Sequence, residues 1–322
     1  MKAIMYTRFG PPEVLELKDI PKPAPKDNEV LIKVRATTVT AGDWRCRSRI
    51  LPKGFGVVGG IYLGFSAPKH PILGSELSGE IEAVGKAVGK FKVGDQVFAF
   101  TGAKMGCYLE CKCLAEDGAL ALKPANLSHE EAAALSFGGT TALGFLKKAG
   151  IKQGDKVLVN GASGGVGTAA VQLAKHFGAE VTAVCSGANF DLVKSIGADK
   201  AIDYTKEDFT RNGETYDIIV DTAGTAPFGR SKASLKKGGS LLLVLADLPE
   251  MLAAPWASLT SGRKIIAGGV KSGAEDLRFL ANLVESGRFK PVIDRRYSFD
   301  QMAEAHRYVD TGRKKGNVVI VL

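Results

Sequence analysis

The sequence lacks long apolar runs, a disulfide pattern and an abundance of aromatic residues, which make up 7% of its 322 positions. Because a membrane helix needs about 20 consecutive apolar residues, we expect no integral membrane part. The five cysteines are an odd number at irregular spacing, so we expect reduced thiols. Residues 1–10 lack the apolar segment of a signal peptide, and a cytoplasmic location is therefore expected.

Basic residues are in excess, with a formal net charge of +9, but they form no long tract. We interpret the small basic clusters at 45–49, 236–237, 295–296 and 313–315 as solvated surface. No aromatic RNA-binding motif accompanies them, so we expect no nucleic acid partner. The charge leaves open an attraction to phosphate-bearing ligands or to an anionic membrane surface.

Residues 156–178 have the pattern of a buried strand, a glycine turn and an amphipathic helix. The apolar residues 157–159 are typical of a strand that is covered on both faces. Gly164 and Gly167 take the second and third places of the G-x-G-x-x-G pattern, and Ala162 replaces the first glycine. Such a turn lets backbone N–H groups approach a pyrophosphate at the positive end of the helix. The segment therefore predicts a dinucleotide-binding βαβ unit.

The order of strand and helix patterns predicts two parts of the chain. Residues 1–122 are rich in strand patterns, among them 29–39, 79–85 and 94–100, which suits a small β barrel. From about residue 128 strands and helices alternate, as in a doubly wound parallel sheet. The expected strands there are 156–161, 180–185, 217–221, 239–245 and 263–270, and the expected helices are 166–177, 189–196, 227–235 and 274–287.

Two further segments connect or complete these parts. Residues 49–72 are rich in glycine and proline and predict a long loop, which is either a lid over a site or a mobile segment. The tail after Pro291 contains a short strand, the helix 300–310 and the strand 317–321. We expect this tail to return to the N-terminal part.

An ordered set of local motifs resembles the medium-chain dehydrogenase/reductase superfamily, and in particular its zinc-independent quinone oxidoreductase branch. The matching segments are 1–4, 29–34, 71–80, 93–98, 138–142, 161–167, 195–199 and 203–204. The resemblance implies an α/β fold, with a Rossmann doubly wound parallel sheet inserted between segments of a GroES-like β-barrel catalytic domain. It implies a catalytic domain of residues 1–123 and 290–322, a nucleotide-binding domain of residues 124–289, and an active site between the two.

The positions of the family's catalytic zinc ligands carry other residues in this chain. Thr40 stands in place of a cysteine, Ser75 in place of a histidine, and the third region, 135–138, has neither residue. Hydroxyl groups do not replace thiolate and imidazole for zinc, so no catalytic metal is expected.

The cysteine-rich run 107–113 is the other candidate for metal chemistry. Cys111 and Cys113 are two positions apart, so a strand places them on one face, and a zinc clip usually has two residues between its ligands. Buried thiols that act as small apolar groups are favoured over redox or metal chemistry.

The end of the second strand of the dinucleotide-binding unit predicts NADP(H) rather than NAD(H). No carboxylate follows this strand to bind a ribose hydroxyl, and Ser186 and Asn189 can donate hydrogen bonds to a 2′-phosphate. Tyr204 matches a tyrosine that contacts this phosphate in the family; alternatively it packs on the sheet. The chain departs from the family at Ala188 and Asn189, where Lys or Arg is frequent.

The resemblance also implies further contacts with the cofactor. They involve the nicotinamide, the pyrophosphate and the adenosine or ribose. The implied residues are Thr141, Ser163, Gly164, Gly165, Val166, Thr222, Ala223, Leu243, Val244, Gly269 and Val270.

Without a metal, the chemistry rests on the cofactor, which supplies hydride while the protein binds and orients the acceptor. A quinone is the favoured acceptor, an α,β-unsaturated carbonyl is the alternative, and a non-catalytic NADPH-binding protein is a third hypothesis. Thr40, Asp43 and Tyr62 are the candidate catalytic residues, although Asp43 could instead cap a turn or pair with Arg45. A homodimer is expected by analogy, because strand 263–270 lies at a sheet edge that relatives pair across.

Overall fold

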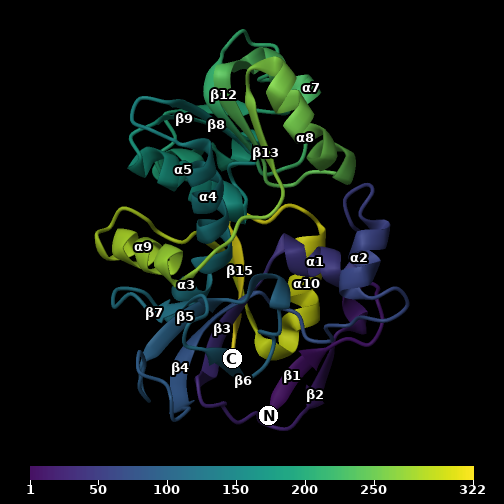
Figure 1. Cartoon of the computed structure of the whole chain (residues 1–322), viewed down its shortest axis with the longest axis vertical. Helices are drawn as coiled ribbons and strands as arrows, with labels where there is room; N and C mark the ends of the chain where they lie inside the picture. The colour runs from purple at the N-terminus through teal and green to yellow at the C-terminus, as the bar shows by residue number, and fades with distance from the viewer.

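The chain folds around two β-sheets, which lie one above the other in the computed structural model of residues 1–322 (Figure 1). The upper sheet has six parallel strands in the spatial order β10–β9–β8–β11–β12–β13. Their bounds are Lys156–Asn160 (β8), Glu180–Cys185 (β9), Lys200–Asp203 (β10), Tyr216–Asp221 (β11), Leu235–Leu243 (β12) and Lys264–Ala267 (β13). This is the 3-2-1-4-5-6 order of a doubly wound dinucleotide-binding sheet, so the predicted fold class is confirmed.

Both faces of this sheet are covered, as its apolar strands require. Val157 and Val159 of β8 belong to a core of 33 buried residues that includes side chains of α4 (Ser136–Ala149), α5 (Gly165–His176) and α9 (Ala274–Glu285). Leu158 belongs to a separate core of 13 residues, which includes Ala254 of α8 (Leu248–Ser261). Two shorter helices, α6 (Phe190–Ser195) and α7 (Phe228–Ser231), lie between strands in the chain.

The lower sheet is mainly antiparallel and joins the two ends of the chain. Its order is β14–β15–β3–β4–β5–β7, and β6 pairs with β3. The bounds are Glu29–Val39 (β3), Glu76–Val84 (β4), Gln96–Phe100 (β5), Cys111–Ala115 (β6), Leu120–Leu122 (β7), Ile293–Ser298 (β14) and Asn317–Val321 (β15). The tail returns as predicted, because β15 pairs with β3, where Val318 lies opposite Val39.

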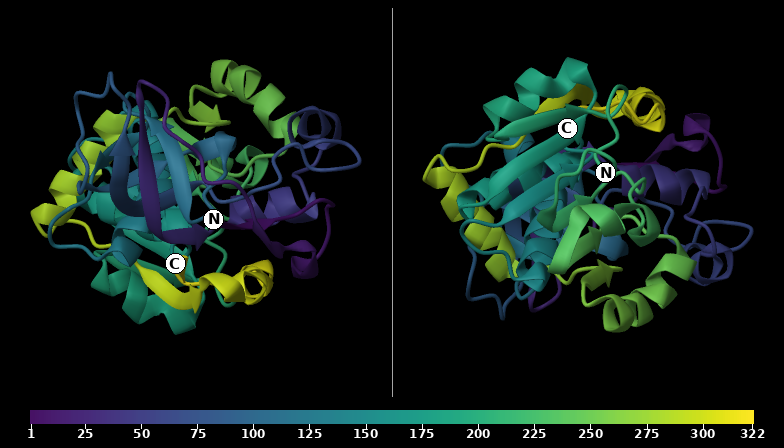
Figure 2. Two further views of the ribbon diagram at one scale, coloured as in Figure 1. Left: turned by 90° about the horizontal axis from the view of Figure 1, so that it is seen from below. Right: turned by 90° about the horizontal axis from the view of Figure 1, so that it is seen from above.

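Smaller elements surround this sheet. β1 (Lys2–Met5) and β2 (Glu16–Asp19) form a separate antiparallel pair, α3 (His129–Ala133) leads into α4, and α10 (Met302–Asp310) precedes β15. Both chain ends lie in this lower part, close together when the molecule is viewed from below and from above (Figure 2). No helix combines the length and the apolar character needed to cross a membrane.

Several predicted boundaries were wrong. The stretch 49–72 was expected to be a loop but contains the helix α2 (Gly56–Leu63), and α1 (Ala41–Ser48) precedes it. The helix α8 was not predicted, because Pro255 and exposed apolar side chains disturb its amphipathic pattern. The expected helix 227–235 is shorter, since α7 ends at Ser231 and β12 already begins at Leu235.

Candidate active site

Two of the three predicted catalytic residues line one cavity of about 200 Å³. Thr40 and Asp43 lie there at the start of α1, and Ser75 lies there just before β4. The remaining lining residues are Gly42, Phe100, Gly102, Ala103, Met105 and Phe137. Apolar side chains therefore face a small group of hydroxyl and carboxyl groups, an arrangement typical of small-molecule sites.

Thr40 and Asp43 also form the capping box of α1. The Asp43 N–H donates to Thr40 Oγ1 at 3.2 Å, and the Thr40 N–H donates back to Asp43 Oδ2 at 2.8 Å. The Thr40 hydroxyl donates to the same carboxylate oxygen at 2.6 Å, and the Gly74 N–H donates to Asp43 Oδ1 at 3.0 Å. The capping alternative for Asp43 is thus present in the structure, whereas the guanidinium of Arg45 binds the Ala41 carbonyl instead. A capping role does not conflict with a catalytic one, because both side chains still face the cavity.

The environment of Asp43 is unusual for a carboxyl group. Burial raises its pKa, while hydrogen bonds from Thr40, Gly74 and Tyr108 lower it, and burial is the larger effect. The neighbouring Glu76 is also fully buried, and burial raises its pKa to about 8. Asp43 is therefore the one carboxyl group that lines the cavity, and Glu76 lies behind it, bound by the Thr38 hydroxyl and the Phe137 N–H.

The donor set at this cavity does not fit a zinc ion. Ser75 Oγ is buried and has no hydrogen-bond partner, so it is available to a ligand oxygen. Thr40 and Ser75 provide hydroxyls and Asp43 provides a carboxylate, but no thiolate or imidazole lines the cavity. No group of three or more His, Cys, Asp and Glu side chains comes together in a metal-binding arrangement.

Tyr62 is placed at the rim rather than in the cavity. It lies on α2 with 40% of its surface exposed, and its hydroxyl donates to the carbonyl of Ala103, which lines the cavity. The structure therefore brings Thr40 and Asp43 together and leaves Tyr62 outside them.

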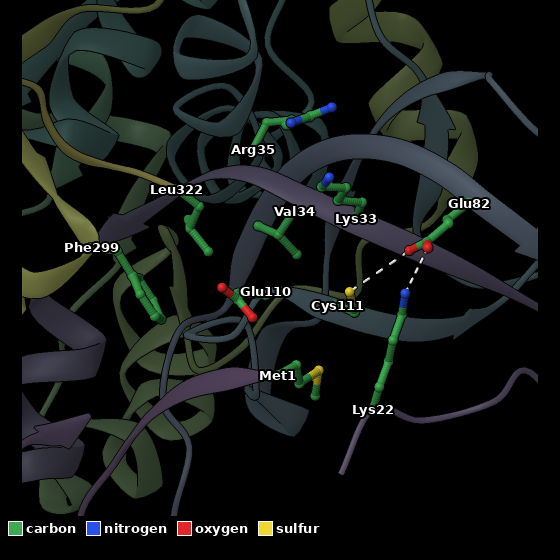
Figure 3. A pocket seen from close by; sticks show the side chains of 10 residues that line it. All are labelled: Met1, Lys22, Lys33, Val34, Arg35, Glu82, Glu110, Cys111, Phe299 and Leu322. Carbon is green, nitrogen blue, oxygen red and sulfur yellow. Dashed lines mark hydrogen bonds and ion pairs between the residues drawn. The ribbon is translucent and has the colours of Figure 1, made fainter. Parts of the chain in front are cut away.

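A larger cavity of about 460 Å³ lies near the two chain ends and contains none of the predicted site residues (Figure 3). Met1 and Leu322 line it, and the Lys22 ammonium pairs with Glu82 at 2.6 Å. The thiol of Cys111 also faces Glu82 there, at 3.9 Å, and burial raises the pKa of this thiol. Of the other cysteines in the 107–113 run, Cys107 is buried and Cys113 is half-buried on β6.

The glycine turn before α5 fits a pyrophosphate. The helix begins at Gly165 after Gly164, which has no side chain to cap it, so the N–H groups of its first turn are left for an anion. A Cβ on Gly164 would meet a single atom, the Gly161 carbonyl oxygen at 3.5 Å, so this position is open to a ligand. A Cβ on Gly167 would approach that oxygen to 2.1 Å, which explains why this position needs glycine.

Lys314 lies beside the glycine turn, a position that the sequence interpretation missed. Its Nζ lies 3.1 Å from the position that a Cβ on Gly165 would take, beside the turn. Burial lowers the pKa of Lys314 to about 8, while Glu76 opposes this shift. The segment is held there because the Gly316 N–H donates to the Ser163 carbonyl at 2.8 Å. The interpretation of the 313–315 cluster as solvated surface was therefore wrong for Lys314.

The predicted residues at the adenosine end also lie together. Asn189 Nδ2 donates to Ser163 Oγ and to Ser186 Oγ, each at 3.1 Å, and Asn189 Oδ1 has no partner. In this structure both Asn189 N–H groups are engaged and the two serine hydroxyls keep protons to donate; donation by Asn189 to a 2′-phosphate stays a prediction. Tyr204 is 64% exposed, so it does not pack on the sheet.

One negative charge near this end was not foreseen. A carboxylate oxygen of Asp203 lies 2.7 Å from the position of a Cβ on Gly187, since β10 pairs with β9. Hydrogen bonds from Thr205, and from the Gly187 N–H, lower the pKa of Asp203 and keep it ionised. The carboxylate is already bound by these donors, which reduces its repulsion of a nearby phosphate.

The other implied cofactor contacts fall at two places. The first is the carboxyl edge of β11 and β12, where Thr222 Oγ1 donates to the Asn160 carbonyl at 2.8 Å and the Val244 N–H donates to the Asp221 carbonyl at 3.0 Å. Ala223 and Leu243 also lie at this edge. The second is α4, which carries Thr141 and packs against Val270, while the Gly269 carbonyl accepts from Lys148 at 3.1 Å. Ligands of open α/β sheets bind at this edge.

Comparisons with known proteins agree over nearly the whole chain. Residues 26–142 match the family model described as alcohol dehydrogenase GroES-like domain, and residues 196–320 match the one described as zinc-binding dehydrogenase. The 2-methylene-furan-3-one reductase of Solanum lycopersicum is 36% identical over 99% of this chain and 79% of the relative. The chloroplastic NADPH-dependent alkenal/one oxidoreductase of Arabidopsis thaliana is 32% identical over the same shares.

Among solved structures, the quinone oxidoreductase from Coxiella burnetii superposes with a TM-score of 0.87 and 32% identity, over 100% of this chain and 99% of the other. Identity at this level, over nearly the whole length, assigns the family: the chain belongs to the medium-chain dehydrogenase/reductase superfamily, and it is an oxidoreductase of the quinone oxidoreductase-like branch that uses a nicotinamide cofactor.

Proposed function

We propose that the protein is an NADPH-dependent, zinc-independent oxidoreductase that transfers hydride to a quinone. The observation that carries this proposal is a cavity of hydroxyl, carboxyl and apolar groups beside a glycine turn that is open to a pyrophosphate. We place the catalytic domain at 1–123 and 290–322 and the nucleotide-binding domain at 124–289. The order of strands in the two sheets supports this division.

The residues of this chain have separate tasks in the proposed reaction. Gly165 and Val166 present backbone N–H groups to the pyrophosphate, and Lys314 adds a positive charge. Gly164, whose N–H donates to the Gly161 carbonyl, lets the pyrophosphate approach the turn. Bound NADPH supplies the hydride. Thr40 and Ser75 hold the acceptor's oxygen, where negative charge develops as hydride arrives. The aromatic and methionine side chains of the cavity exclude water around the acceptor.

Preference for NADPH rests on the adenosine end of the site. The hydroxyls of Ser163 and Ser186 accept from Asn189 and keep protons to donate. Tyr204 is exposed, and its N–H donates to the carbonyl of Cys185, which precedes Ser186. The name of the 32% identical Arabidopsis relative also specifies NADPH. Because Asp203 opposes a 2′-phosphate, we expect a moderate preference.

Reduction of an α,β-unsaturated carbonyl is the second candidate. It is favoured by the Solanum relative, which is more similar to this chain than the Arabidopsis relative and is named for the reduction of an enone-like furanone. Hydride addition to the β-carbon leaves charge on an oxygen, so Thr40 and Ser75 would serve this reaction in the same way.

A turnover assay separates the candidates. NADPH or NADH oxidation is followed with a panel of quinones and a panel of enones, and kcat/KM is compared. We expect the highest kcat/KM with NADPH and a quinone. A higher value with enones selects the second candidate, and a higher value with NADH overturns the cofactor preference. If the nucleotide binds while no acceptor is reduced, the proposed reaction is wrong.

The homodimer and the cytoplasmic location are also proposals. β13 is at the edge of the six-stranded sheet, as expected from the sequence, and it is the strand through which two copies would meet. The cytoplasmic location remains a prediction.

A further inference from the structure

A chain of buried polar side chains runs from the cavity toward the surface behind Thr40. Asp43 and Arg47 lie on α1, Tyr108 lies just before β6, and His306 and Asp310 lie on α10. All except Asp310 are fully or almost fully buried, and the Asp310 side chain is 26% exposed. The reaction scheme above uses none of Tyr108, His306 and Arg47. Buried polar groups reduce stability unless they are satisfied, so their grouping calls for an explanation.

Two of the links have short distances. Thr40 Oγ1 and Asp43 Oδ2 are 2.6 Å apart, and the Tyr108 hydroxyl is close enough to the Asp43 carboxyl to lower the pKa of Asp43. His306 Nε2 lies 3.2 Å from the same Tyr108 hydroxyl, with the two rings edge to face at 5.7 Å. Gly74 fixes the tyrosine, because a Cβ there would approach its ring to 2.5 Å.

At the Asp310 end of this series of side chains, several buried polar atoms have no hydrogen-bond partner. Arg47 Nη2 donates to Asp310 Oδ2 at 2.6 Å. Arg47 Nε and Nη1, His306 Nδ1 and Asp310 Oδ1 are buried and have no hydrogen-bond partner. Two donors and two acceptors on three neighbouring residues can bind a water molecule that exchanges protons with solvent.

We propose that Tyr108 and His306 relay the proton that accompanies hydride transfer, from the surface at Asp310 to Thr40 in the cavity. This inference rests on the proposed function, since each reduced quinone or enone takes up one hydride and one proton. Tyr108 and His306 are positioning residues, because they act on the acceptor through Asp43 and Thr40.

The proton transfers balance at every atom. The acceptor's carbon or oxygen gains hydride, and its oxygen gains the proton of the Thr40 hydroxyl. Thr40 regains a proton from the acid form of Asp43, Asp43 regains one from Tyr108, and Tyr108 regains one from His306 Nε2. His306 takes a proton at Nδ1 from the solvent side. No oxidant or reductant beyond the nicotinamide cofactor is needed.

The charges around the chain suit this order of transfers. Burial raises the pKa of Asp43, and the titratable groups near it include Cys46, Tyr6, Glu76, Cys107 and Tyr108. The Arg47 guanidinium acts on the pKa of Tyr108. Burial and the Arg47 guanidinium hold the pKa of His306 well below its usual range. His306 therefore stays neutral, but gaining a proton at Nδ1 for the one lost at Nε2 leaves it as the other tautomer, so its ring must turn over before the next cycle.

The test removes the tyrosine hydroxyl and keeps its ring. In Tyr108→Phe we expect kcat to fall about tenfold or more, within the range of acid–base catalysis. The Kd for NADPH, measured by fluorescence, is expected to be unchanged. We also expect a larger solvent deuterium isotope effect and partial recovery of kcat with rising concentration of an acidic buffer such as imidazole. A merely structural loss would not produce that recovery.

Tyr6→Phe is the matched control. Tyr6 is equally buried in the same apolar cluster as Tyr108, but its hydroxyl is not one of the links in the chain. This variant should keep the kcat and the isotope effect of the wild type. An equal fall of kcat in both variants would overturn the relay.

A second variant and a spectroscopic measurement test the His306 end of the proposed relay. His306→Gln should also lower kcat, and imidazole should partly restore it. This variant serves as the test if Tyr108→Phe does not fold. Among the four histidines, NMR should show His306 neutral at pH 6, with its Nε2 signal shifted in Tyr108→Phe. If Tyr108→Phe and His306→Gln both keep the wild-type kcat, or if His306 is protonated at pH 6, the relay is overturned while the proposed function stands. A wild type that reduces neither acceptor panel overturns both.

Discussion

At the scale of single residues, burial decides what the basic side chains of this protein do. Arg47 belongs to a short basic cluster that the sequence indicated as surface, yet it is 1% exposed and binds Asp310. Lys314 comes from another such cluster and lies beside the glycine turn instead of in solvent. A charge count cannot separate such residues from exposed lysines, because their burial depends on contacts between segments that are far apart in the chain.

Lys314 gives a prediction about the pH dependence of cofactor binding. Burial lowers its pKa to about 8, so its ammonium attracts the pyrophosphate below this pH and loses its charge above it. We expect the Kd for NADPH, measured by titration calorimetry, to rise as the pH passes about 8. Lys314→Met should raise the Kd about tenfold at pH 7, the effect of losing one charged hydrogen bond.

Lys314→Arg is the control for this prediction. Its guanidinium keeps the charge at all accessible pH values, so the Kd should remain nearly constant between pH 7 and pH 9. A wild-type Kd that does not change across pH 8 would contradict a role for the Lys314 charge.

At the scale of elements, the sequence predicted those whose local pattern and tertiary environment agree. The strand β8, the glycine turn and α5 were predicted within about one residue, since an apolar run, glycines and a helical repeat follow in order. The helices α2 and α8 were missed. α2 contains three glycines and two adjacent valines, which are poor helix formers, and α8 contains Pro255. α8 packs against β13, a contact that its local sequence does not reveal, whereas most apolar side chains of α2 are exposed.

The residues of the candidate site also divide into those that a local motif predicted and those that were missed. Thr40, Asp43 and the turn glycines were found because each lies in a short motif of recognisable chemistry. Tyr108, His306 and Lys314 were missed, since they reach the site from separate segments and no local spacing connects them. Tertiary contacts between the β6 region, α10 and the tail bring them there.

The glycine turn gives a prediction that separates folding from binding. Gly167→Ala would place a Cβ 2.1 Å from the Gly161 carbonyl oxygen, so the backbone must shift. We expect a loss of about 1–3 kcal/mol in the free energy of unfolding, as in other overpacked sites, measured by denaturant titration. Gly164→Ala is the matched variant, because its Cβ would meet that oxygen at an ordinary 3.5 Å.

In Gly164→Ala the stability should change by less than about 0.5 kcal/mol, as at uncrowded positions. Its methyl group would occupy the side of the turn from which a pyrophosphate approaches, so the Kd for NADPH should rise. Unchanged affinity in this variant would mean that the cofactor does not lie against Gly164.

At the scale of the whole molecule, the C-terminal tail connects the two sheets. β15 pairs with β3 in the lower sheet, and just before it Gly316 binds the Ser163 carbonyl of the dinucleotide turn. One continuous segment therefore binds both the dinucleotide turn and β3, the strand that leads to Thr40. A movement of one sheet relative to the other would pass through this segment and alter the distance between the two ligands.

The upper end of the molecule supports a prediction about assembly. The edge strand β13 has an unpaired side, and α8, which packs against it, exposes Leu252, Trp256 and Leu259 on one face. An open edge beside an apolar face is a common place for two copies to meet. We expect the wild type to be a homodimer in light scattering after size exclusion. Trp256→Glu buries a charge in that contact and should shift the protein toward the monomer.

Val93→Glu is the control, because it changes another exposed apolar residue, on the turn before β5, and should leave the dimer intact. A wild type that is monomeric at every concentration, or a Trp256→Glu variant that dimerises as strongly as the wild type, would contradict assembly through this face.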